Sequence, residues 1–103
     1  MPNGIDKNWV RLCVVINGFR AQHHSWPSKI RLPEIILDDL RNFLFTPESF
    51  SIIEKKLRFI IDEIGSLVAE DEDGRKFDYN NMNFQTSKPD IDAETWFGIE
   101  PDL

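Results

Sequence analysis

The stretch from residue 46 to residue 79 constrains the fold most, because the spacing of its apolar side chains changes within it. Up to residue 64 these side chains recur every three or four positions, which places them on one face of a helix. Thr46 can cap the first amides of that helix, and Pro47 suits its first position. After Gly65 apolar and polar residues alternate, which is the spacing of a strand. The sequence therefore predicts a helix over 47–64 followed by β-structure, and the helical stripe comprises Phe50, Ile53, Leu57, Ile60, Ile61 and Ile64.

The strands expected after Gly65 form a hairpin within residues 66–80. Leu67 and Ala69 alternate with Ser66, Val68 and Glu70, Asp73-Gly74 supplies turn chemistry, and alternation resumes through residue 79. Because an isolated hairpin is only marginally stable, a third strand is needed. Segments 29–32 and 59–62 both qualify, and the second choice means that the preceding helix ends near Arg58.

The segment 9–23 fits two interpretations. Alternation of Val10, Leu12, Val14 and Ile16 fits a strand, whereas the spacing of Trp9, Leu12, Ile16, Phe19 and His23 fits a helix. We favour the helix, because Asp6 can cap it. A further helix is expected over 32–45. The fold class is α+β in either case, with two or three helices packed on a small antiparallel sheet that contains the 66–80 hairpin.

The length of 103 residues fits a single domain. We expect residues 1–80 to form the globular α+β domain and residues 81–103 to form an extended, acidic C-terminal tail with two prolines and few aliphatic residues. Trp96 and Phe97 are the apolar exceptions in this tail, and they can dock it onto the core. Self-association would add stability to so small a domain, so a homo-oligomer is compatible with the sequence.

The composition restricts the cellular location of the protein and the class of partner that it can bind. Cys13 is the only cysteine, so an intrachain disulfide is excluded and a reducing compartment is favoured. The longest apolar run, 12–16, is far too short to span a membrane, and we expect a cytoplasmic protein with no membrane contact. The net charge is −6, with six Lys/Arg against four Asp/Glu in residues 1–45 and six against fourteen in residues 46–103. An acidic chain repels phosphate backbones, which makes nucleic acid an unfavourable partner.

One basic and aromatic stretch is a candidate interaction site. It contains His23, His24, Trp26 and Arg31, and in principle its charges can bind phosphate while Trp26 stacks on a base. The competing interpretation is a loop in which Trp26 belongs to the core. Adjacent histidines point in different directions and no third ligand is visible, so we assign no metal.

The other candidate motifs do not support catalysis. The acidic run 70–73 lacks the ligand spacing of a calcium loop, and we expect it to be the solvated tip of the hairpin. Cys13 lies within an apolar run and has the features of a buried thiol rather than a nucleophile. Neither a nucleophile elbow nor a phosphate-binding glycine loop occurs, so we assign no cofactor and no catalytic residue.

The sequence therefore predicts a small, acidic, non-catalytic module that binds another protein, either through its acidic face or through Trp96 and Phe97 in the tail. A first alternative is an antitoxin- or inhibitor-like protein whose carboxylates imitate phosphate charge. A second is a small enzyme or nucleic-acid binder that uses the His23, His24 and Trp26 region. A concave pocket holding a histidine would favour the enzyme, and an aligned row of exposed acids would favour the mimic.

Overall fold

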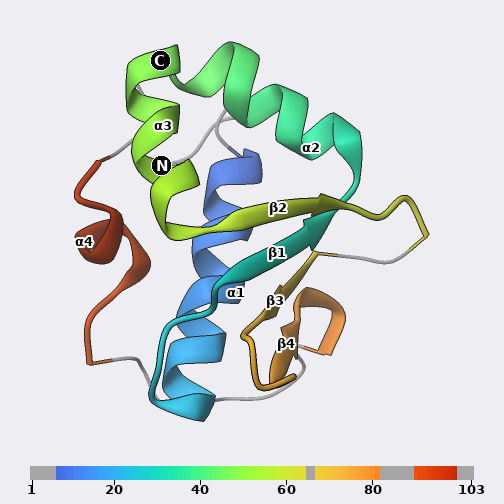
Figure 1. Ribbon diagram of the computed structural model, residues 1–103, viewed down its shortest axis with the longest axis vertical. Coiled ribbons are helices and arrows are strands. Elements are labelled where there is room, and N and C mark those ends of the chain that lie inside the picture. The colour runs from blue at the N-terminus through green and yellow to red at the C-terminus, as the bar shows by residue number, and fades with distance from the viewer. Residues whose placement is uncertain (1–6, 65–66, 82–89, 100–103) are drawn as a thin grey trace.

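The computed structural model describes residues 7–64, 67–81 and 90–99. This part of the chain forms a small α+β domain with four α-helices, one more than the largest number expected, around a four-stranded sheet (Figure 1). The elements are, in chain order, α1 (Lys7–His23), β1 (Lys29–Leu32), α2 (Glu34–Asp39), the π-helix η1 (Leu40–Leu44), α3 (Pro47–Lys56), β2 (Arg58–Ile61), β3 (Val68–Glu70), β4 (Lys76–Asp78), the 3-10 helix η2 (Tyr79–Asn81) and α4 (Ala93–Phe97).

The sheet is mixed, so the expectation of a purely antiparallel sheet was wrong. Its strand order is β2-β1-β3-β4, in which β1 pairs in parallel with β2 and antiparallel with β3. The parallel pair arises because α2, η1 and α3 lie between β1 and β2, and such a long crossover returns the chain in the same direction. Strands β3 and β4 pair antiparallel within the predicted 66–80 segment, although residues 65 and 66 lie outside the described residues.

The helix predicted over 47–64 ends early, at Lys56, and its last predicted residues form β2. Its start is as expected, because the Thr46 hydroxyl accepts a hydrogen bond from the amide of Ser49 at 3.2 Å. Leu57, the residue after α3, takes an extended conformation, and β2 begins at Arg58. Phe59 then pairs with β1 and stacks on Phe50 of α3 at 5.7 Å between ring centroids. Tertiary pairing thus outweighs the helical spacing, and both candidate third strands are strands of the sheet.

Helix α1 runs behind the sheet in Figure 1 and is buried on two sides. One side packs on β3 and β4, where Gly18 lies so close to Phe77 that a Cβ at residue 18 would be 2.3 Å from the ring. The other side packs on α4. Segment 9–23 is therefore helical, and its apolar residues surround the helix rather than forming one stripe.

The described part of the tail, residues 90–99, is helical at its centre rather than fully extended. Asp92 caps α4 by accepting a hydrogen bond from the amide of Thr95 at 2.8 Å, and Gly98 ends the helix in the left-handed conformation that glycine favours. Ala93 and Phe97 are buried, so this segment packs on the domain.

The opposite side of the sheet carries none of the described helices across it (Figure 1). Because Ile30, Ala69 and Phe77 point into the core, their neighbours along each strand point the other way. We call this surface the outer face, and it comprises Lys29, Arg31, Arg58, Ile60, Val68, Glu70, Lys76 and Asp78.

Candidate functional site

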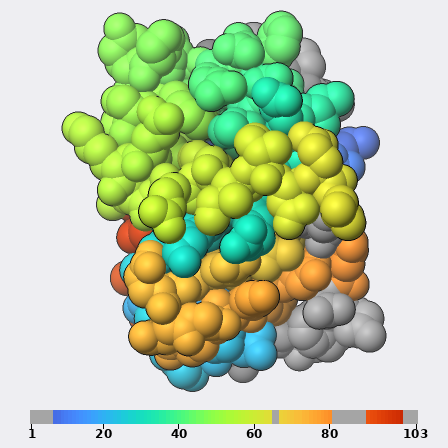
Figure 2. Space-filling model, turned by 45° about the vertical axis from the view of Figure 1, so that its right-hand side comes forward, coloured from blue at the N-terminus to red at the C-terminus, as the bar shows by residue number. Residues whose placement is uncertain are grey.

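The outer face presents its side chains in two rows that cross all four strands. In Figure 2 the atoms of β2, of β1 and of the β3–β4 hairpin form successive bands over this side of the molecule. The strand register sets the first row as Arg58, Lys29, Glu70 and Lys76, and the second as Ile60, Arg31, Val68 and Asp78. Four of these side chains are basic and two are acidic, so the local balance is opposite in sign to the net charge of the chain, which is −6.

A hollow of about 490 Å³ lies in the outer face. Arg31, one of the residues predicted for a site, lines it together with Asp62, Val68, Glu70, Lys76 and Asp78. Within it the Arg31 guanidinium donates a hydrogen bond to Glu70, whose side chain is only 7% exposed. This ion pair ties β1 to β3 and holds both side chains in place at the base of the hollow.

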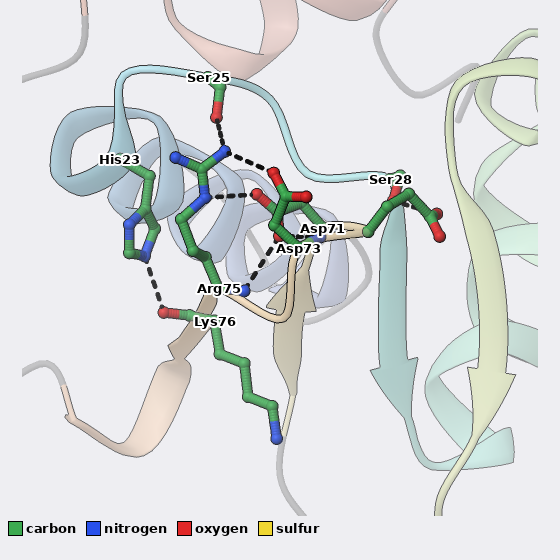
Figure 3. Close-up of polar contacts among 8 residues, drawn as sticks. His23, Ser25, Ser28, Asp71, Asp73, Arg75 and Lys76 are labelled. Carbon is green, nitrogen blue, oxygen red and sulfur yellow. Dashed lines mark hydrogen bonds and ion pairs between the residues drawn. The ribbon is translucent and has the colours of Figure 1, made fainter.

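The tip of the β3–β4 hairpin is ordered by Asp71 (Figure 3). Its carboxylate accepts hydrogen bonds from the amides of Asp73 and Arg75, both at 3.0 Å, and from Nε of Arg75 at 2.7 Å. Burial raises the pKa of Asp71, but the hydrogen bonds from Arg75 and Asp73 outweigh that effect and leave the pKa below its ordinary value. The expectation of a fully solvated tip was wrong for Glu70 and Asp71, which are buried beside arginines, and holds for Glu72 and Asp73.

The predicted histidine pair does not form a site with Arg31. His23 is the last residue of α1, and its Nε2 lies 3.1 Å from the carbonyl oxygen of Lys76 (Figure 3). The His23 ring packs on Phe19. His24 is exposed and has a left-handed backbone. The His23 imidazole therefore lies at the junction of α1 and β4, and neither histidine lines the hollow of the outer face.

Trp26 and Trp96, far apart in sequence, are brought together by the fold. Their rings stack with 4.4 Å between centroids and 6° between planes. The Arg20 guanidinium lies 4.7 Å from the Trp26 ring centroid, and Lys56 Nζ lies 5.3 Å from that of Trp96. Arg20 also donates two hydrogen bonds to Asp90, at 2.8 and 2.9 Å, which lower the pKa of Asp90 to about 2.

Further tail contacts lie on α1. Phe97 packs against Trp9 at 5.3 Å between centroids, and the Trp9 indole donates a hydrogen bond to Glu94 at 3.0 Å. Cys13 is buried on α1 beneath this segment. Burial raises the pKa of its thiol, and the carboxylates of Glu94 and Asp92 raise it further. Both tail aromatics thus make contacts within the chain: Phe97 packs on Trp9 of α1, and Trp96 stacks on Trp26 in the loop after α1.

Sequence reasoning missed a second hollow, of about 440 Å³, at the junction of β2 with the helices before it. Its apolar lining is Leu37, Leu57 and Phe59, and its charged lining is Arg41, Glu54 and Arg58. Arg58 also stands at the end of the first row of the outer face, so the two features are continuous. No local pattern marks this site, since its members come from α2, η1, α3 and β2.

Two negative findings apply to the described residues. Across 7–64, 67–81 and 90–99, no group of three His, Cys, Asp or Glu side chains could hold a metal ion. In the same ranges, no helix has the length and apolar character to cross a membrane.

Comparison with known proteins gives no match to a family model, to a curated protein or to a solved structure.

Proposed function

We propose that this chain is a small, non-catalytic cytoplasmic module that binds another protein through the outer face of its sheet. The main observation behind the proposal is that the described helices leave one side of the sheet uncovered. None of the described helices crosses this side of the sheet (Figure 1), and the atoms of all four strands cover it (Figure 2). A hollow of about 490 Å³ lies in this surface. Protein interfaces combine a partly buried apolar centre with a polar rim that makes direct hydrogen bonds.

The charges of the outer face support a protein partner. Arg31 and Glu70 form a fixed pair of opposite sign, and Val68 lies half-buried beside them. Mixed charges around an apolar centre suit a partner surface that also carries both signs. A nucleic acid would instead require a basic field without acids in the same rows.

The phosphate-mimic alternative has less support, because the acids of the hairpin already have partners. Glu70 pairs with Arg31, Asp71 with Arg75, and Glu72 accepts a hydrogen bond from Ser28 at 2.7 Å. Ser28 and the nearby Lys29 lower the pKa of Glu72. A mimic needs carboxylates that are free to replace phosphates.

The nucleic-acid alternative at the histidine and tryptophan region also has less support. Trp26 stacks on Trp96, and the Arg20 guanidinium binds Asp90. Both groups would have to leave these contacts before they could bind a base or a phosphate.

The test is quantitative affinity purification from the native host with the wild-type chain and three variants. Val68→Arg fills the outer face and Lys76→Glu reverses an exposed charge on it. Lys55→Glu, which makes the same charge change on the exposed side of α3, is the control. We expect one partner to be depleted at least tenfold by Val68→Arg and by Lys76→Glu, and retained by Lys55→Glu. A partner that all variants retain would refute binding at the outer face.

A further inference from the structure

The second hollow is lined by Arg58, whose side chain has no hydrogen-bond or ion-pair partner among the described residues. The backbone amide of Arg58 donates to the carbonyl oxygen of Ser28 at 2.9 Å. Its guanidinium attracts Glu72 only at longer range. The other described arginines are engaged: Arg11 with Asn8, Arg20 with Asp90, Arg31 with Glu70, Arg41 with Asp38 and Arg75 with Asp71. Arg58 is exposed, so its guanidinium is available to a ligand.

The surroundings of Arg58 define what such a ligand carries. Leu37, Leu57 and Phe59 line the hollow with apolar surface, and its volume of about 440 Å³ admits a large side chain. A guanidinium presents a planar fork of donors that matches a carboxylate. Arg41 adds little attraction, because it is paired with Asp38 at 2.8 Å.

The remaining charged group of the hollow, Glu54, limits the negative charge that a ligand can carry. It lies on α3 and repels a second negative charge inside the hollow. The site therefore favours one carboxylate beside Arg58 and an uncharged side chain within the hollow.

We infer that this hollow is an anchor site for an acidic peptide segment of the partner, in which an aromatic side chain enters the hollow and the carboxylate of the next residue binds Arg58. The inference rests on the proposed function, since Arg58 also ends a row of the outer face. A partner seated on the outer face would extend over β2 and place this anchor in the hollow.

The experiment uses two dipeptide probes that differ only in charge, Ac-Phe-Asp-NH2 and Ac-Phe-Asn-NH2. Each is titrated into the full, isotope-labelled chain while the backbone amide resonances are followed by NMR. We expect resonances around Leu37, Leu57 and Arg58 to shift, with about fivefold tighter binding of the Asp probe, which is the upper range for an exposed ion pair.

Three variants assign the effect to individual charges. Arg58→Gln should abolish the preference for the Asp probe, and Glu54→Gln should strengthen that preference. Arg11→Gln, an arginine on α1 outside the hollow, should leave it unchanged. Equal binding of both probes, or shifts that avoid the hollow, would overturn the inference.

The two proposals fail in different ways. Loss of partner capture in Val68→Arg together with equal binding of both probes would leave the proposed function standing and refute the anchor. Preference for the Asp probe with capture unaffected by Val68→Arg would refute the outer face as the interface while the hollow still binds acidic peptides.

Discussion

Removal of the Trp96 ring should release residues 90–99 from α1 and expose Cys13. The indole of Trp96 stacks on Trp26 and also lies beside Phe97, at 5.1 Å between centroids. Trp96→Ala deletes these contacts and the Lys56 contact, while Asp90 keeps its ion pair with Arg20. The docked segment is then held by fewer interactions.

The size of the effect follows from the contacts that are lost. A stacked aromatic pair contributes about 0.5–1.5 kcal/mol beyond burial, and an exposed cation–π contact contributes about 0.5–1 kcal/mol. With the apolar area of a half-buried indole added, the docking free energy should fall by about 2–3 kcal/mol. That change corresponds to a roughly 30- to 150-fold larger population of the undocked segment.

Cys13 is a convenient reporter, because it is the only cysteine and is buried beneath α4. The rate at which a disulfide reagent labels Cys13 at pH 8 should rise in Trp96→Ala by the same factor as the undocked population, roughly 30- to 150-fold. Phe43→Ala, which removes an aromatic ring that is 66% exposed on η1, serves as the control and should label at the wild-type rate. A low sensitivity of the labelling rate to urea distinguishes local undocking from global unfolding. If Trp96→Ala labelled no faster than wild type, the stacked pair would not hold the segment on α1.

Two further predictions concern other contacts of α1. Gly18→Ala should destabilise the domain by about 1 kcal/mol in urea unfolding, because overpacking against Phe77 outweighs the helix propensity gained; a variant as stable as wild type would contradict this. The pKa of Asp90, lowered to about 2 by Arg20, lies below its ordinary value near 4. Its stabilising effect is therefore complete above about pH 4 and is lost as the pH falls towards 2, so the near-UV circular dichroism of the tryptophans should weaken in that range. Asp90→Asn should lose this step, and an unchanged profile in that variant would refute the assignment.

The ambiguity of segment 9–23 had a physical cause. A helix with one buried face shows one apolar stripe, but α1 is buried against both the sheet and α4. Its apolar positions therefore satisfied the spacing of a strand and that of a helix together. Only the positions of β3, β4 and α4, which are distant in sequence, decide between them.

The helix predicted from Pro47 to Ile64 shows the same dependence on distant partners. Residues 59–61 fit the helical stripe and also have strand propensity. The pairing of β2 with β1 resolves this conflict in favour of the strand, since the exposed edge of β1 needs hydrogen-bonding partners. The cap at Thr46 could be predicted because it depends on residues within one turn.

Sequence distance also separates the ion pairs that could be predicted from those that could not. Arg75 follows Asp71 by four residues, so their contact in the hairpin tip was accessible to local reasoning. The Arg31–Glu70 pair joins residues that are 39 apart and depends on the β1–β3 register. The acidic run therefore suggested a solvated surface, whereas half of it is buried beside cations.

These pairings explain why the net charge is a poor guide to the partner. The charge of −6 is a property of the whole chain, but many of its carboxylates are held by arginines or by amides within the domain. What a partner meets is the charge that remains uncommitted at the surface it covers. In the hollow beside the outer face, the described charges without an ion-pair partner are Arg58 and Glu54, and Lys76 is another on the outer face. The acidic chain is therefore expected to accept a single carboxylate beside Arg58.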